Sequence, residues 1–251
     1  MLSAEVMGAL ALGVLWVNVL LIAAGALLHR GELGARLAAL RSARASGNLV
    51  EGVVDAVEAE RVFAERRTAQ VGRAMTVAGP DRILFTDTKT VASVPGGVVR
   101  AAGGPVTVLG APSSEVWTGR EVPAERPAGP AFNAAWKSAS TSRGVELDVV
   151  QRVGKGAHVW VVGEREGDTL RPTLVSTACP FSVLARCRRV LLAAAVGAMA
   201  GAAGITALAL VPPGFGSVST IGSALGLVFF LLVQPAAVAA RNAARTPDRQ
   251  P

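Results

Sequence analysis

Three long uncharged runs divide the sequence and differ in pattern from what lies between them. They cover residues 6–28, 190–211 and 221–240. A helix rises about 1.5 Å per residue, so about 20 apolar residues cross a hydrocarbon core of roughly 30 Å. We therefore predict three transmembrane helices, one near the N-terminus and two in a hairpin turned by the Pro- and Gly-rich residues 212–220.

Two other interpretations compete with these spans. A cleaved signal peptide needs a basic start and a shorter apolar run, whereas this chain begins MLSAE and carries Glu5. A hairpin buried in a soluble core would require protein to cover two adjacent uncharged helices of membrane length. A retained anchor and a membrane hairpin are therefore the favoured interpretations.

Arginines flank the three runs on one side only. The N-terminus and the 212–220 turn carry no basic side chain. The flanking arginines are Arg30, Arg36, Arg41, Arg44, Arg186, Arg188, Arg189, Arg241 and Arg245. By the positive-inside rule, the N-terminus lies outside, residues 29–189 lie in the cytoplasm, and the hairpin crosses out and back. We expect a multi-pass protein of the bacterial inner membrane.

The pattern between the first and second runs changes to short Val-rich segments bounded by Gly, Pro or Asp, which is typical of strands. These segments are 48–57, 82–86, 104–110, 145–151, 157–164 and 170–176. RVGKG and REGDT have the composition of hairpin turns, so 145–176 is predicted to be a three-stranded meander. We therefore predict that these strands form a small antiparallel barrel or sandwich.

The predicted fold class is an α+β membrane protein with a small, mostly antiparallel β domain between its first and second membrane helices. Leu33, Leu37 and Leu40 recur at helical spacing among arginines, so this segment extends the first span or lies on the membrane surface. The predicted parts are an anchor (1–28), a juxtamembrane amphipathic helix (29–46), a cytosolic β-rich domain (47–178) with an exposed loop (111–140), a membrane entry and hairpin (179–240), and a basic tail (241–251).

The charge and composition of the chain indicate a binding partner. Mean hydropathy is +0.45 and the formal net charge is +7, with the excess of positive charge beside the predicted spans. Anionic lipid headgroups are the expected partner of such juxtamembrane arginines. Nucleic acid is not expected, because no basic stretch is interleaved with aromatic residues.

Motifs for chemistry are missing from the sequence. Two cysteines and two histidines do not make a disulfide scaffold or a zinc cluster of the usual spacing. VGKG at 153–156 lacks the spacing of a phosphate loop, and His158 fits an exposed strand face. Cys179 and Cys187 are predicted to be structural thiols, with palmitoylation of Cys187 as an alternative. We predict no catalytic residue, metal or cofactor.

Small and polar residues inside the spans indicate helix packing. The GxxxG pairs are Gly197–Gly201 and Gly222–Gly226, which would form a seam between the second and third spans. Asn18 and Gln234 would be costly in lipid, so each is expected to bond another helix. Homo-oligomerisation through the membrane helices stays open.

The order of segments resembles a known family. VEGVV with Gly52, then VGKGAHVWVVGE with Gly163 and Glu164, then LRP…LVS and a closing membrane helix follow an N-terminal span. Across residues 1–211 this layout is similar to the beside-a-membrane (GIDE-type) domain of the Mulan family of membrane-anchored ubiquitin ligases, as a bacterial-type relative. That family's catalysis rests on a C-terminal RING domain, and here a third span and RNAARTPDRQP stand in its place. The resemblance therefore implies the membrane-apposed β domain without ligase activity.

The functional prediction is a non-enzymatic integral membrane protein whose cytosolic β domain binds a protein or a lipid headgroup. One alternative is an accessory subunit of a transporter or channel, for which Asn18 and Gln234 offer few polar groups. The other is an enzyme with an unrecognised site, for which the candidate carboxylates would be Asp81, Asp87, Glu146 and Asp148.

Overall fold

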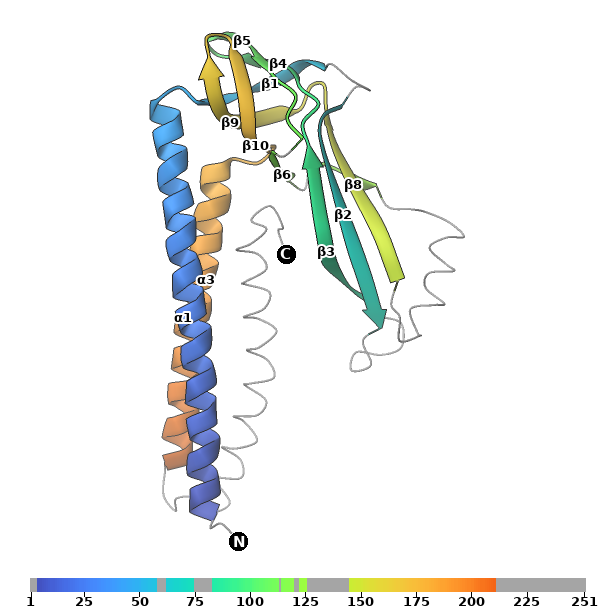
Figure 1. The fold of residues 1–251 in the computed structure, drawn as a ribbon. Helices are drawn as coiled ribbons and strands as arrows, with labels where there is room; N and C mark the ends of the chain where they lie inside the picture. The colour runs from blue at the N-terminus through green and yellow to red at the C-terminus, as the bar shows by residue number, and fades with distance from the viewer. Residues whose placement is uncertain are drawn as a thin grey trace. The chain divides into compact units, whose positions relative to one another are not determined.

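The computed structural model describes residues 4–57, 62–74, 83–112, 114–119, 122–125 and 145–210. Along the chain, the β strands follow one long helix and precede a second one (Figure 1). The elements are α1 (Ala4–Ala45), β1 (Leu49–Val57), β2 (Val62–Ala74), β3 (Ile83–Ser93), β4 (Gly97–Ala101), β5 (Gly104–Val108), β6 (Glu115–Trp117), β7 (Ala124–Glu125), β8 (Val145–Gly154), β9 (His158–Glu166), β10 (Thr169–Ser176) and α3 (Pro180–Leu210).

Helices α1 and α3 confirm the first two predicted apolar helices. The segment 29–46 continues α1 as a single helix of 42 residues, which decides between the two alternatives for it. Gly47 ends α1 with a φ of 75°, and Asn48 N–H donates to the Ala43 carbonyl at 2.8 Å, as in a Schellman cap. Pro180 opens α3, where its missing N–H is not needed. The third predicted span, 221–240, lies outside the described residues.

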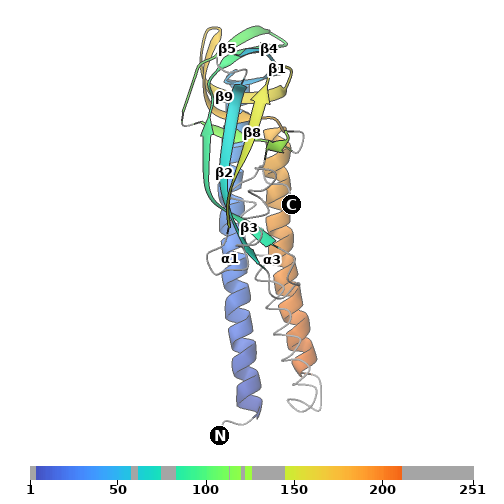
Figure 2. The same cartoon turned by 90° about the vertical axis from the view of Figure 1, so that its right-hand side faces the viewer.

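The two helices run antiparallel and side by side, as both views show (Figures 1 and 2). An apolar cluster joins them along one stripe of each helix. Its buried members are Leu15, Val19, Ala198, Ala202 and Ile205, with Leu12, Trp16 and Met199 packed against them. Small alanines on α3 opposite larger side chains on α1 let the two backbones approach closely.

Five strands of the β domain close into a small barrel. Each is hydrogen-bonded to the next in the order β5–β4–β1–β9–β10, and a parallel pairing of β5 with β10 completes the ring. Counted along the chain, these strands follow the order first, second, third, fifth, fourth, which is the connectivity of an OB-type barrel. The inside is filled mainly by valines, including Val54, Val99, Val159 and Val161. The predicted small barrel is thus confirmed, with one parallel pair among antiparallel ones.

The strands that adjoin the two helices meet on the same part of β9. Leu49 at the start of β1 pairs with Val162, and Leu174 near the end of β10 pairs with Val162 from the other side. Trp160, which precedes Val162 by two residues in β9, likewise pairs with Glu51 of β1 on one side and with Ser176 of β10 on the other. The chain therefore enters and leaves the barrel at matching register on either side of one strand.

A second, four-stranded antiparallel sheet has the order β3–β2–β8–β7 (Figure 1). Its centre is a pairing of β2 with both β3 and β8 along most of its length. Phe63, Ala64 and Val153 of this sheet join the buried cluster of the barrel, so the barrel and the base of the sheet share one core.

The predicted meander across 145–176 is wrong. β9 and β10 form the expected hairpin around Gly167, but β8 pairs with β2 and β7 instead of β9. Both edges of β9 are already taken by β1 and β10, which leaves no edge for β8. The RVGKG turn instead carries the chain from the second sheet to the barrel and docks on β1 through Val54.

The exposed loop predicted at 111–140 is also wrong in its first part. Strand β6 pairs in parallel with the end of β10, and Val116, Trp117 and Thr118 are buried. The buried hydroxyl of Ser114 donates to the Pro172 carbonyl at 2.7 Å. Hydrogen bonding of this segment to β10 removes it from solvent despite its Pro- and Ser-rich composition. Residues 126–140 lie outside the described residues.

Candidate functional site

The two helices present apolar side chains outward over most of their length. Both are long and apolar enough to cross a membrane, and only 22% of the most apolar window of each is buried. The exposed large apolar side chains are Val6, Leu10, Val14, Val17, Leu20, Leu21, Leu27 and Leu28 on α1 and Val190, Leu192, Val196 and Leu208 on α3. Contiguous apolar surface of this kind marks contact with lipid or with another apolar partner.

The predicted GxxxG pair of α3, Gly197 and Gly201, does not form the centre of the seam with α1. Gly197 is exposed, and a Cβ built on it meets no atom within 4 Å. The seam with α1 uses the next positions, Ala198 and Ala202, because alanine at this spacing is already small enough for close approach. Gly201 is half-buried beside the seam. Gly222 and Gly226 lie outside the described residues, so a seam with the third span stays a prediction.

Asn18 does not bond another helix through its amide nitrogen, contrary to the prediction. Its Nδ2 donates to the Val14 carbonyl of its own helix at 2.8 Å. A side-chain bond to the carbonyl four residues earlier satisfies a polar group in lipid without a partner helix. The observed interhelical bond instead joins Trp16 Nε1 to Thr206 Oγ1 at 2.9 Å. Gln234 lies outside the described residues.

The membrane-flanking arginines fall into two groups. The exposed ones are Arg36, Arg41, Arg44, Arg186 and Arg189. Arg30 and Arg188 are only half exposed, and their Nε atoms are buried without a hydrogen-bond partner. Arg241 and Arg245 lie outside the described residues. The sequence pattern identified all these arginines as one set, whereas burial separates two of them.

Arg188 lies across the backbone of α1. A Cβ built on Gly34 would be 3.7 Å from Cζ and Nη2 of Arg188, which is an ordinary contact distance, so the guanidinium packs against α1 at residue 34. This contact places the arginine between the helices, where a lipid-facing arginine would not be. Sequence spacing alone could not show it, because the contact depends on how α1 and α3 pair.

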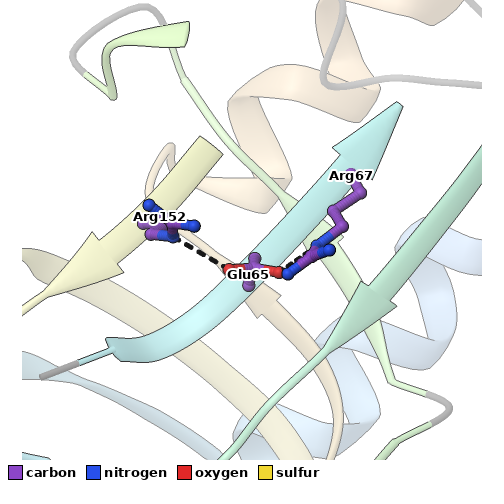
Figure 3. Close-up of polar contacts among 3 residues, drawn as sticks. All are labelled: Glu65, Arg67 and Arg152. Carbon is purple, nitrogen blue, oxygen red and sulfur yellow. Dashed lines mark hydrogen bonds and ion pairs between the residues drawn. The ribbon is translucent and has the colours of Figure 1, made fainter. Parts of the chain in front are cut away.

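The strongest polar cluster of the β domain centres on Glu65 in β2 (Figure 3). Its carboxylate accepts hydrogen bonds from Arg67 Nε and, at 2.9 Å, from Arg152 Nε of the neighbouring β8. Burial alone raises the pKa of Glu65, but the hydrogen bonds and charges of the two arginines outweigh it and hold the pKa below its ordinary value. The cluster ties two strands together and leaves Glu65 ionised at neutral pH.

A pocket of about 300 Å³ lies beside this cluster, where the second sheet passes into the barrel. Arg152, His158 and Thr177 supply its polar lining, and Val122 and Pro123 form part of its apolar wall. His158 is exposed, its Nε2 lies 3.6 Å from Glu51 Oε1, and its ring meets Trp160 edge-on with ring centroids 4.4 Å apart. Apolar walls with a few convergent polar groups are typical of small binding sites. The sequence pointed to His158 only as a residue of an exposed strand face.

In the part of the chain that the structure describes, no three His, Cys, Asp or Glu side chains gather as metal ligands. Cys187 is buried and Cys179 half-buried, and neither forms a disulfide. Burial of Cys187 argues against its acylation in this conformation, because the thiol must reach the acyl donor.

Comparisons with known proteins do not assign the chain to a family: no family model, no curated protein and no solved structure matches it. The resemblance to the GIDE-type domain therefore stays a prediction based on the order of segments.

Proposed function

We propose that this chain is a non-enzymatic integral membrane protein that presents a cytosolic β domain for binding a partner protein. The observation that carries the proposal is the insertion of a closed barrel between two apolar helices, with three residues joining each helix to its neighbouring strand. A domain held at both ends in this way is tied to the membrane surface through two covalent connections. Lipid headgroups then act as the support of the domain through the flanking arginines.

The proposal includes a third span and an orientation. Arg-rich flanks support a cytoplasmic domain, an external N-terminus and a hairpin over residues 190–240. The family resemblance supports a membrane-apposed domain.

Cysteine accessibility tests the orientation. Cys179 and Cys187 are first replaced by Ser, and a single cysteine is then placed at Ser217 or at Ser140. In intact cells an impermeant thiol reagent should label S217C and leave S140C unlabelled until the membrane is opened. Labelling of S140C alone in intact cells would reverse the topology and end the proposal of a cytosolic domain.

Site-specific photo-crosslinking tests the binding role. A photoreactive residue at His158, in the pocket, should give a discrete protein adduct in cells expressing the full chain. The matched position is Glu164, which is also exposed on β9 but does not line the pocket. Adducts of equal pattern at both positions, or lipid adducts only, would contradict specific protein binding by this face.

A further inference from the structure

Arg30 on α1 and Arg188 on α3 interrupt the buried stripes of the two helices. Each stands four residues after one buried apolar residue and three before another: Ala26 and Leu33 for Arg30, Leu184 and Leu191 for Arg188. Residues at these spacings share one face of a helix. The two arginines therefore occupy positions that the pattern on each helix reserves for apolar packing.

Pairing between the helices brings these positions to within about one helical turn of each other. Eighteen residues separate Trp16 from Gly34 on α1, and eighteen separate Arg188 from Thr206 on α3. Because Trp16 bonds Thr206 and Gly34 faces Arg188, the two helices stay in register over about 27 Å. This length is close to the roughly 30 Å of a hydrocarbon core. Arg188 thus lies at the opposite end of the apolar layer from Thr206, at headgroup depth.

Arg30 lies at the same end. It is the second residue after the uncharged run 6–28 and is one helical turn from Gly34, where the Arg188 guanidinium sits. Both Nε atoms are buried without a hydrogen-bond partner. A buried donor left unsatisfied is costly, and two positive charges near one end of the helix pair favour an anion there.

A carboxylate of the helix pair does not supply the missing acceptor. Helix α3 contains no acidic residue, and α1 contains only Glu5 and Glu32. Glu32 is exposed and contacts His29 Nδ1 at 2.9 Å. A phosphate group has the matching chemistry, because its oxygens accept paired N–H donors of guanidinium groups and its charge offsets theirs.

We propose that Arg30 and Arg188 form a specific site for the phosphate of an anionic lipid headgroup, held between α1 and α3 with the guanidinium of Arg188 seated over Gly34. The inference rests on the proposed membrane protein and deepens it. It turns a general attraction of nine arginines to the surface into one lipid-binding site made by two of them. The remaining flanking arginines act through long-range attraction only.

Binding of defined lipids to the full chain tests the site. The protein is purified in detergent, freed of lipid, and titrated with dioleoylphosphatidylglycerol while native mass spectra record bound lipid. The variant Arg30→Gln/Arg188→Gln should bind this lipid about tenfold more weakly or worse, since it loses two charge-assisted bonds. Dioleoylglycerol, which has the same chains and no phosphate, should bind wild type and variant equally.

Matched variants keep the result specific. Arg186→Gln/Arg189→Gln removes the same charge from exposed positions on α3 and should leave the affinity within about twofold of wild type. Gly34→Leu should weaken binding by filling the seat of Arg188, while Gly31→Leu, at a residue with open space around it, should not. Because Gly34→Leu and Gly31→Leu change no charge, they test the site independently if Arg30→Gln/Arg188→Gln fails to fold.

Three results would overturn the site. They are equal losses in the two arginine pairs, an unchanged affinity in Arg30→Gln/Arg188→Gln, and stabilisation of the lipid-free protein by inorganic phosphate alone, which would identify a soluble ligand. The topology assay at Ser217 and Ser140 is independent of this measurement. A reversed topology with an intact lipid site would reject the cytosolic domain and keep the site. The expected topology with no lipid site would reject the site alone.

Discussion

The indole of Trp16 donates to the hydroxyl of Thr206 at 2.9 Å, and that hydroxyl donates in turn to the Ala202 carbonyl at 2.8 Å. One side chain on α1 is thereby linked to two successive turns of α3. Each polar atom in the chain of bonds has a partner, which matters in lipid because water is not available to replace it. The link fixes the register of the two helices near one end of their seam.

Replacing either side chain should expose this link in a double-mutant cycle. Trp16→Phe and Thr206→Val should each lower the free energy of unfolding, with a coupling of about 0.6 kcal/mol and at most about 1.7 kcal/mol. Reversible unfolding of the full chain in bicelles measures it. As a control, Asn18→Val removes a bond within α1 and should show no coupling to Thr206→Val. A coupling of zero for the first pair would mean that the bond does not hold the helices.

Larger side chains should distinguish the α1–α3 seam at Ala202 from the exposed face that carries Gly197. Ala202 is fully buried against α1, so Ala202→Leu should destabilise the helix pair by about 1–3 kcal/mol. Gly197→Leu adds more atoms, but at an exposed position with open space, and should have little effect on the α1–α3 pair. The same unfolding measurement compares them, and a larger cost at Gly197 would point to a partner for that face.

The barrel should not tolerate a side chain at Gly163. A Cβ there would overlap the backbone carbonyl of Arg171 on β10 and contact Pro172, and backbone cannot rotate away as a side chain can. Gly163→Ala should therefore cost about 3 kcal/mol or more and broaden the thermal transition followed by circular dichroism. Gly103→Ala, in open space between β4 and β5, is the control. Equal stability of the two variants would disprove the close approach.

Acid should weaken the second sheet through Glu65. The pKa of Glu65 in the folded protein lies below its ordinary value of 4.5, so its contribution to stability is complete above that pH and is lost as the pH falls through the folded pKa. Glu65→Gln should cost about 1.5 kcal/mol at neutral pH and flatten the loss of stability in acid. Asp55, whose pKa the Arg100 hydrogen bond also lowers, forms an exposed pair, so Asp55→Asn should change stability less. Chemical unfolding between pH 3 and pH 7 measures both variants, and an unaltered acid limb in Glu65→Gln would contradict the assignment.

Sequence patterns predicted the helices and the regular strands because each buries one face at a simple period. The apolar runs at 6–28 and 190–211 became α1 and α3, and Val-rich segments became β1, β5, β9 and β10. Strand β2 escaped prediction because VFAERRTAQVGRA carries charges at adjacent positions. The carboxylate of Glu65 accepts hydrogen bonds from Arg67 of the same strand and from Arg152 of β8. That partner lies 87 residues away in the chain, beyond any local pattern.

Short strands and interhelical contacts were missed for a related reason. β6 has three residues, and it forms because the end of β10 offers an unpaired edge. The placement of Arg188 over Gly34 depends on the register of two helices that are far apart in sequence. Burial of Arg30 and Arg188 therefore could not be separated from the exposure of the other arginines until the helices were paired.

The shared register of Leu49 and Leu174 on Val162 has a mechanical consequence. Strands lie about 4.8 Å apart, so β1 and β10 are separated by about 9.6 Å across β9, and packed helices lie about 8–10 Å apart at their axes. The two points at which the chain enters and leaves the barrel are therefore about as far apart as the axes of two packed helices. A force that pulls β1 away from β10 passes through the β1–β9 ladder and then through the β9–β10 ladder, so β9 transmits the load between the two connections. A partner that binds β9 would stiffen this joint, and one that displaces β9 from either neighbour would leave the α1–α3 seam as the remaining link between the two helices.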